Sequence, residues 1–250
     1  MEKENSNQIV QYDNSLNKIS LNTFTAIDQN FFITLCAHVK NKGTEEIELS
    51  FSKIKEETGY STKNTNERFI KDLSRMNEKL LTTAFGYENE RYISMFILFT
   101  DFIIDKKKQT LTVSVNEKYT YLLNELNKEF TKFKLKTFNN LSSKYSKTLF
   151  RIIMQFRTAG FVRIGKDELI NIMGVPKTYK TNDMVRKILE PSIEELSPHI
   201  KGLKMEIVRE KTRGNPVKEF IFTFEKEEKT QIERILEPAI EEKSVFIEYV

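Results

Sequence analysis

Residues 52–73, SKIKEETGYSTKNTNERFIKDL, decide the fold of this chain, because residues 167–188, DELINIMGVPKTYKTNDMVRKI, repeat their pattern. The two stretches align without a gap when Gly59 is placed on Gly174, an offset of 115 positions (174 − 59 = 115). Apolar residues then fall on apolar residues and a cation falls on a cation: Ile54 on Leu169, Phe69 on Met184, Ile70 on Val185, Leu73 on Ile188 and Lys71 on Arg186. In each copy a short amphipathic segment ends at the glycine and a longer one follows. This order predicts a helix-turn-helix, whose second helix can enter the major groove of DNA.

The segment before each copy matches as well. Four apolar positions and a glycine coincide at an offset of 117 positions (160 − 43 = 117): Phe32 on Leu149, Leu35 on Ile152, Cys36 on Ile153, Val39 on Phe156 and Gly43 on Gly160. After each long helix the hydrophobic period changes to two, over residues 81–87, 92–104 and 110–115 and then over residues 203–209 and 217–224. Helices followed by antiparallel strands are typical of a winged helix. The sequence therefore predicts an α+β protein with two tandem winged-helix domains.

The domain limits follow from the repeat. We predict a first winged-helix domain over residues 21–136 and a second over residues 137–226. Residues 1–20 are polar and predicted to be flexible, although Ile9, Val10 and Tyr12 could add a short strand to a sheet. Residues 227–250 are predicted to be an acidic tail. Between the domains, residues 130–137 alternate sharply and predict a strand with a basic outer edge formed by Lys132, Lys134 and Lys136.

The formal net charge of +4 hides an asymmetry along the chain. Residues 225–250 hold eight Glu against four Lys and Arg, a sum of −4, so the rest of the chain sums to +8. A basic body with an acidic tail fits a polyanionic partner such as nucleic acid. A merely soluble, lysine-rich protein fits the same charge distribution.

Several classes of protein are not expected from this sequence. No run of apolar residues approaches the ~18 of a membrane helix, and the amino terminus lacks the basic flank and apolar stretch of a signal peptide. We therefore expect a cytoplasmic protein with no membrane contact. Cys36 is the single cysteine, which excludes an internal disulfide. The chain has no Gly-rich phosphate loop, and its two histidines, His38 and His199, lie far apart, so we expect no enzyme, no catalytic site, no metal and no cofactor.

Short motifs in residues 141–196 resemble those of the initiator replication (Rep) proteins of iteron-containing plasmids. They are LSSKY at 141–145, LFR at 149–151, FRTAG at 156–160, MGV at 173–175, Tyr179 and ILEPSIEE at 188–195. The first half is similar to the looser amino-terminal domain of that family, and the resemblance covers about residues 8–225. The acidic tail is a departure that the family does not explain.

The resemblance implies a function that periodicity alone does not give. Members of this family have tandem winged-helix domains, bind directly repeated origin sequences (iterons) in double-stranded DNA and recruit host replication proteins such as a helicase or a primase. Many repress their own promoter as a dimer. A plain winged-helix transcriptional repressor remains a second interpretation, and a protein-interaction scaffold without a DNA role is a third.

The second domain is predicted to read bases, because Arg or Lys can read guanine and Asn can read adenine from the start of a recognition helix. Its candidates are Tyr179, Lys180, Thr181, Asn182, Asp183, Arg186 and Lys187. Hydroxyls and free backbone amides at the opening of the preceding helix could grip phosphate, together with nearby lysines. These candidates are Ser142, Ser143, Lys144 and Lys147. The hairpin of this domain would contact the backbone or the minor groove through Arg209, Lys211, Arg213 and Lys218.

The first domain is predicted to contact phosphate and to dimerise. Its recognition-helix candidates are Lys63, Asn64, Asn66, Arg68 and Lys71, and the strand edge adds Lys132, Lys134 and Lys136. An apolar strand region, formed by Ile93, Met95, Ile97, Phe99, Ile103 and Ile104, favours pairing with a second chain. We therefore predict a homodimer built on the first domain in equilibrium with DNA-active monomers.

Overall fold

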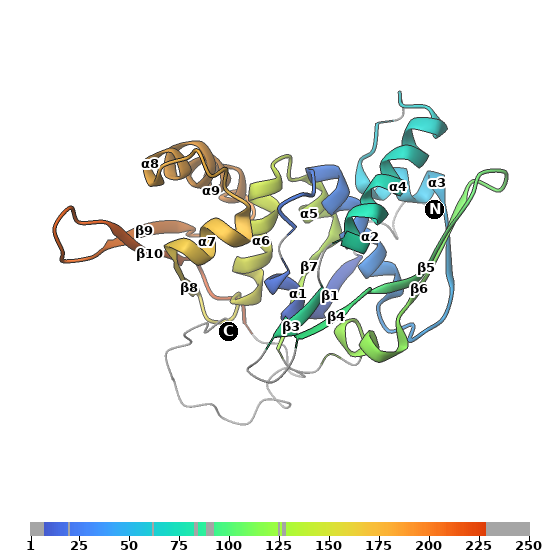
Figure 1. The fold of residues 1–250 in the computed structure, drawn as a ribbon, viewed down its shortest axis with the longest axis horizontal. Helices are drawn as coiled ribbons and strands as arrows, with labels where there is room; N and C mark the ends of the chain where they lie inside the picture. Colours follow the sequence, from blue (N-terminus) through green and yellow to red (C-terminus); the bar gives the residue numbers. More distant parts are fainter. Residues whose placement is uncertain are drawn as a thin grey trace.

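The computed structural model of this chain describes residues 8–19, 21–61, 63–82, 85–88, 93–124, 126 and 129–228 (Figure 1). The first winged helix comprises α2 (Ala26–Val39), β2 (Ile47–Ser50), α3 (Phe51–Thr58), α4 (Asn66–Thr82), β5 (Phe99–Asp105) and β6 (Thr110–Val115). A separate hairpin, β3 (Phe85–Glu88) with β4 (Ile93–Phe96), is inserted between α4 and β5. A 3-10 helix (Glu117–Leu122), β7 (Phe130–Lys134) and α5 (Leu135–Asn140) follow.

The second winged helix has the same order of elements. It comprises α6 (Lys144–Gln155), β8 (Phe161–Gly165), α7 (Lys166–Met173), α8 (Thr181–Met184), a π-helical turn (Val185–Leu189), α9 (Glu190–Leu196), β9 (Lys204–Arg209) and β10 (Val217–Thr223). Helices α8 and α9 and the turn between them form one long helix. The π turn ends two residues before Pro191, which lacks an amide hydrogen, and Glu190 donates its amide to Val185 O in the wider π pattern.

The sequence repeat is a structural repeat. Helix α3 begins at Phe51 and α7 begins 115 positions later at Lys166, and each has eight residues. The first sheet has the order β2-β6-β5 and the second has the order β8-β10-β9, so in both the first strand pairs with the last. Matched apolar positions are buried in both copies, including Ile54 and Leu169. The prediction of two tandem winged-helix domains in an α+β protein is confirmed.

The amino-terminal segment is more ordered than the sequence predicts. Residues 9–13 form β1 (Ile9–Asp13), which pairs antiparallel with β7, and α1 (Ser15–Lys18) follows. Val10 and Tyr12 are fully buried, so the short strand predicted through Ile9, Val10 and Tyr12 is confirmed, and a flexible segment over residues 1–20 is wrong for this part. Residues 1–7 and residue 20 lie outside the described residues, as does the acidic tail from residue 229 onward.

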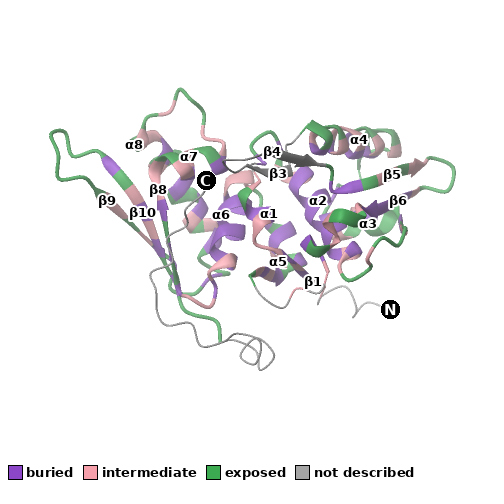
Figure 2. Cartoon of the chain, turned by 60° about the horizontal axis from the view of Figure 1, so that its bottom comes forward, coloured by how far each residue is buried: buried purple, intermediate pink, exposed green. Residues whose placement is uncertain are grey.

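The two domains share one continuous hydrophobic core, drawn in purple in Figure 2. Helix α6 lies at its centre and packs against α2 and β7 on one side and against α7 and α9 on the other. Buried polar contacts reinforce this junction: Arg151 of α6 donates to the Tyr12 hydroxyl at 3.1 Å and to Leu16 O at 2.6 Å. Asn17 donates to Thr131 Oγ1 at 2.7 Å. Within the described residues, no helix is both long and apolar enough to cross a membrane.

Candidate nucleic-acid interface

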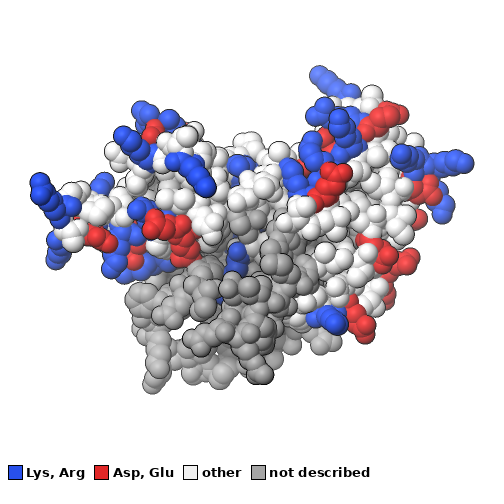
Figure 3. Space-filling view, in the orientation of Figure 1, with Lys and Arg blue, Asp and Glu red and all other residues white. Residues whose placement is uncertain are grey.

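The second helix of each helix-turn-helix lies on the same side of the molecule. In Figure 1, α4 and the α8–α9 helix occupy the upper face at opposite ends of the long axis, with α5 and α6 between them. The β5–β6 and β9–β10 hairpins extend outward at the two ends. Figure 3 shows Lys and Arg gathered over both helices and at both hairpin tips, while the middle of this face carries few charges. The basic groups therefore form two separate patches on one face.

Each recognition helix is positioned by a glycine that ends the helix before it. Gly59 has φ 64° and Gly174 has φ 60°, the left-handed region in which other residues are strained. The amide of Gly59 donates to Glu56 O at 3.3 Å, and that of Gly174 donates to Asn171 O at 3.1 Å. Both glycines were predicted from sequence as helix ends, and the structure confirms them.

The cations of the second recognition helix are close to one carboxylate. Asp183 Oδ1 lies 2.9 Å from Lys187 Nζ and 3.9 Å from an Arg186 guanidinium nitrogen. The hydrogen bond from Lys187 is the main cause that lowers the pKa of Asp183. Lys187 also lies over the ring of Tyr179, 4.8 Å from its centre. The side chain of Arg186 is 73% exposed, so leaving this pair costs it little.

The other predicted residues of this helix gather at its amino-terminal end. Lys180 and Asn182 are exposed, and Thr181 is half-buried. The amide of Lys180 donates to Asp183 Oδ2 at 3.4 Å, which makes Asp183 part of the helix cap. Asp183 thus has a structural role in orienting Lys187 and the helix start, and its predicted DNA contact stays a prediction.

The cations of the first recognition helix are held more tightly. Arg68 Nε lies 3.1 Å from Asp72 Oδ2, and Arg75 lies 2.9 Å from Asp72 Oδ1 and 3.3 Å from Asp28 Oδ1. Asp72 also accepts a hydrogen bond of 2.7 Å from the Tyr60 hydroxyl. Burial alone would raise the pKa of Asp72, but the hydrogen bonds from Tyr60 and Arg68 outweigh it and lower the pKa.

Other predicted side chains of the first domain are more accessible. Lys63, Asn64 and Lys71 are exposed. Asn66 is half-buried and accepts a hydrogen bond of 2.6 Å from Lys55 Nζ. Lys71 occupies the position in α4 that Arg186 occupies in the second domain, and both point away from the core. The structure thus brings the predicted first-domain residues together around the start of α4.

Both hairpin wings end in exposed cations. Arg209, Lys211, Arg213 and Lys218, which were predicted from sequence, are all exposed around the β9–β10 turn. The sequence reasoning missed Lys106, Lys107 and Lys108, which are exposed at the tip of β5–β6. Asp105 holds this tip by accepting from the amides of Lys107 at 2.9 Å and Lys108 at 2.8 Å. A run of three lysines in a predicted hairpin turn was the signal that could have found them.

The opening of α6 does not present a free phosphate site. Glu195 of α9 accepts hydrogen bonds from the Ser142 amide at 2.6 Å and from the Ser142 hydroxyl at 2.7 Å. The Ser143 amide donates to the same carboxylate at 3.4 Å. Burial would raise the pKa of Glu195, but the Ser146 side chain together with Ser142 and Ser143 outweighs it and lowers the pKa. Phosphate could bind Ser142 and Ser143 only by displacing Glu195.

The two lysines of this opening are also engaged within the chain. Lys147 is fully buried and donates to Phe138 O at 2.6 Å, so its predicted phosphate contact is wrong. Burial lowers the pKa of Lys147 to about 7. Lys144 Nζ donates to Asn22 O at 3.1 Å. Burial, and then the charge of Lys79, lowers the pKa of Lys144.

The predicted basic strand edge is divided between two elements. Lys132 and Lys134 lie in β7, opposite Gln11 and Ile9 of β1. Lys136 lies in α5, because β7 ends at Lys134, so the prediction of one strand over residues 130–137 is wrong at its end. Lys134 and Lys136 are exposed and Lys132 is half-buried.

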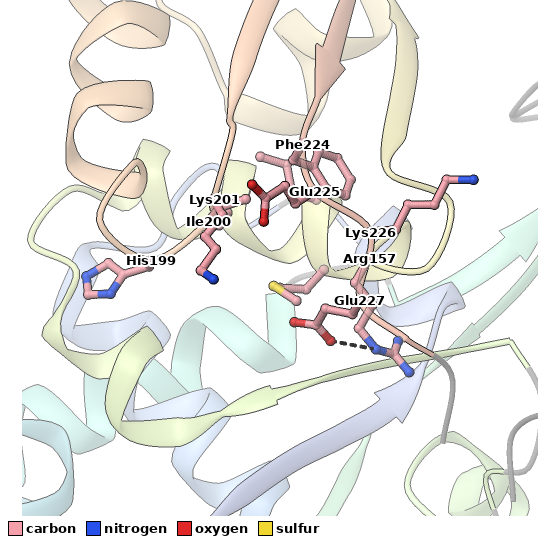
Figure 4. Close-up of a pocket in the computed structure, with 10 residues that line it drawn as sticks. Arg157, His199, Ile200, Lys201, Phe224, Glu225, Lys226 and Glu227 are labelled. Carbon is pink, nitrogen blue, oxygen red and sulfur yellow. Dashed lines mark ion pairs between the residues drawn. The ribbon is translucent and has the colours of Figure 1, made fainter. Parts of the chain in front are cut away.

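A cavity of about 340 Å³ lies at the carboxyl end of α6 (Figure 4). Arg157 and Glu227 form an ion pair of 3.6 Å at one side of it, and His199 lies at the opposite side. Among the described residues, no three His, Cys, Asp or Glu side chains are grouped closely enough to hold a metal ion.

Comparisons with known proteins match both domains. Residues 9–154 match the family model described as "Initiator Replication protein, WH1", and residues 165–224 match "Initiator Rep protein, WH2". A protein of Bifidobacterium longum (strain NCC 2705), "Probable replication protein rep", is 34% identical over 226 residues, which are 89% of this chain and 74% of that protein. The fold is similar to that of the Pi initiator protein, solved in complex with iteron DNA. The TM-score is 0.67 at 14% identity, over 90% of this chain and 99% of that one.

Proposed function

Because this chain belongs to the family of initiator replication (Rep) proteins, we propose that it binds directly repeated sequences in a plasmid origin and initiates replication there. The observation that carries this proposal is the placement of α4 and α8–α9 on one face, each exposing a cation at the matched position, Lys71 and Arg186 (Figure 1). Two recognition helices on one face can enter successive major-groove segments on one side of a duplex. The relative solved on iteron DNA has the same fold.

The two domains are proposed to divide the contacts. Arg186, Lys187 and Asn182 of the second domain read base edges, because they are accessible side chains at the start of a recognition helix. Phosphate contacts come from the first domain, the two wings and the β7–α5 lysines, and they set the position of the protein on DNA without carrying sequence information. Ser142, Ser143 and Lys144 join this set only where DNA displaces their present partners.

A dimer built on the first domain is part of the proposal. Strand β5 is an edge of the β2-β6-β5 sheet, and Ile103 on it is 55% exposed. Ile97, just before it, is 40% exposed, whereas Phe99 is buried. Such an edge can pair with a second chain, and the dimer would repress its own promoter while the monomer initiates. The side chains of Ile93 and Met95 lie outside the described residues. Sedimentation of full-length Ile103→Lys is expected to give monomers where the wild type gives dimers.

Recruitment of a host helicase or primase completes the proposed role, in the cytoplasm. The test uses the full-length chain, a duplex that carries direct repeats found beside its gene, and a scrambled duplex of equal length. We expect tighter binding to the repeats, affinity that falls steeply with salt, and strand opening detected by a reagent specific for single strands. Repeat binding without opening would favour a plain repressor. No salt-dependent binding to either duplex would favour a protein-interaction role.

A further inference from the structure

The two helix-turn-helix glycines have the same backbone conformation but different surroundings. A Cβ added at Gly59 would meet no atom within 4 Å. A Cβ added at Gly174 would lie 2.3 Å from Asn22 Cβ and 2.9 Å from Asn22 Cα. The turn before the second recognition helix is therefore in close contact with a segment of the first domain, and the turn before the first recognition helix is not.

This segment, Leu21–Thr25, connects α1 to α2, and we call it the bridge segment. Leu21 and Phe24 anchor it, since both are buried and the Phe24 amide donates to Leu21 O at 3.0 Å. Thr25 ends it by capping α2, in a reciprocal pair of hydrogen bonds with Asp28. A segment fixed at both ends in this way can transmit a position from one element to another.

The bridge segment holds the first recognition helix on one side. Lys79 of α4 donates to Thr23 O at 2.8 Å and pairs with Asp28 at 2.6 Å. Asp28 is fully buried, and Arg75 of α4 reaches it as well. The carboxyl half of α4 is thus tied to the bridge segment and to the start of α2.

The same segment contacts the second domain on its other side. Asn22 O accepts the hydrogen bond from Lys144 at the start of α6, and Gln29 Nε2 donates to Lys144 O at 3.3 Å. Asn22 also covers Gly174, at the end of α7. Lys79 and Lys144, one from each domain, therefore bind neighbouring carbonyls of one short segment.

We propose that the bridge segment sets the spacing between the two recognition helices, and that the Asn22–Gly174 contact makes the protein specific for the spacing of the two groove segments in its site. This inference rests on the proposed function. An added Cβ needs an ordinary contact of at least 3.4 Å, so alanine at position 174 must move the turn by about 1 Å (3.4 − 2.3 = 1.1 Å). That is about a third of the ~3.4 Å rise of one base pair. Glycine is required at 174 for close approach as well as for its positive φ.

The test compares Gly174→Ala with Gly59→Ala in the full-length chain. Both substitutions force alanine into nearly the same left-handed conformation, so the backbone strain is matched and only the contact with Asn22 differs. The probes are the repeat duplex that the wild type protects from cleavage and the same duplex with one base pair inserted between the two protected groove segments. We expect Gly174→Ala to bind the native duplex about tenfold more weakly than Gly59→Ala, the order of one mismatched base pair. On the inserted duplex, Gly174→Ala should bind less than tenfold more weakly than Gly59→Ala.

A second variant keeps the test valid where Gly174→Ala folds poorly. Asn22→Gly removes the side chain that covers Gly174 and so weakens the contact between the two domains. The ratio of the affinity for the native duplex to that for the inserted duplex should therefore become smaller. Equal weakening in the two glycine variants, or an unchanged preference in Asn22→Gly, would overturn the inference while wild-type repeat binding stands. If the wild type protects no repeat, the proposed function fails and the inference fails with it.

Discussion

The two winged helices differ most in how they hold the cations of their recognition helices. In the first, Arg68 and Arg75 pair with Asp72, whose side chain is only 6% exposed, and Lys79 pairs with the fully buried Asp28. In the second, Arg186 and Lys187 share Asp183, which is 30% exposed. The two helices thus differ in the carboxylates that hold their cations: buried ones in the first domain and a partly exposed one in the second.

This difference fits two roles on DNA. A cation that leaves a buried carboxylate removes part of what compensates the buried charge, which is costly even where other partners remain, as Tyr60 and a second arginine do at Asp72. An exposed pair is worth only ~0–1 kcal/mol, so its cation can exchange a carboxylate for a base edge. This difference supports the proposed division of contacts, in which the first recognition helix places the protein on DNA and the second reads the sequence.

The largest expected effect is on stability, from Asp28→Ala compared with Asp183→Ala. Removing Asp28 takes the buried carboxylate away from Lys79 and leaves Arg75 paired with Asp72 alone, and because both cations are partly exposed we expect a loss of about 2–3 kcal/mol, below the full value for a buried pair. Asp183→Ala should lose much less, because the pair that Asp183 makes is exposed to solvent. Urea unfolding of both variants measures this, and equal losses would remove the distinction between the two helices.

Next in size is an effect on binding at the two matched positions, Arg186 and Lys71. Arg186→Ala should weaken binding to the repeat by roughly 1–3 kcal/mol and nearly spare random DNA. Lys71→Ala should weaken both by a similar small amount and reduce the slope of log K against log salt by roughly 0.9. Titrations on the two duplexes over a salt series measure both. If Arg186→Ala weakens binding to the repeat and random duplexes equally, Arg186 contacts phosphate and does not read a base.

The repeat itself was predictable because its signals are local. Apolar spacing and the glycines at 59 and 174 mark helix faces and helix ends within a few residues, and the offset of 115 positions carries through to the helix boundaries. Alternation predicted the second wing and β6 in the same way, but the single strand predicted over residues 92–104 is wrong, because β4 and β5 lie there and pair in separate sheets. These patterns depend on period and on turn chemistry, which neighbouring residues determine.

The parts that sequence reasoning missed depend on distant contacts. Strand β1 was predicted from Ile9, Val10 and Tyr12, but its partner β7 lies more than a hundred residues away and could not be identified from the sequence. Lys147 looks like a surface cation at a helix start, but the carbonyl of Phe138 receives it in the core. Glu195 reaches Ser142 across 53 positions. No local pattern contains such partners.

A smaller effect tests whether the two wings make equal contacts. Replacing Lys106, Lys107 and Lys108 by alanine should reduce the salt slope of binding by roughly 0.9 for each phosphate that the wing no longer neutralises, equally on repeat and random duplexes. In the second wing, the double variant Lys211→Ala, Arg213→Ala should reduce the salt slope in the same way, by roughly 0.9 for each of two phosphates. If the slope is unchanged in the triple lysine variant but reduced in the Lys211, Arg213 double variant, the first wing does not contact DNA.

The smallest expected effect concerns Glu168 of α7, whose counterpart in the first domain is the exposed Lys53 (168 − 53 = 115). Glu168 Oε1 is buried without a hydrogen-bond partner, and burial raises the pKa of this carboxyl to about 7. A raised pKa means that the neutral form fits the folded state. The stabilisation that the neutral carboxyl contributes is complete below pH 4.5, the ordinary pKa of a glutamate, and disappears as the pH rises through about 7.

Glu168→Gln keeps the shape of the neutral carboxyl and removes this pH-dependent destabilisation. Because the carboxyl retains some contact with water, we expect a gain of only ~1 kcal/mol in the free energy of unfolding at pH 8, and almost none at pH 4.5. Urea unfolding at the two pH values measures it, with Lys53→Gln as the matched control in the first domain, which should change little at either pH. A gain of equal size at both pH values would mean that the carboxyl is not the group that titrates, and a reduced free energy of unfolding at pH 8 would mean that its charge is stabilised in the fold.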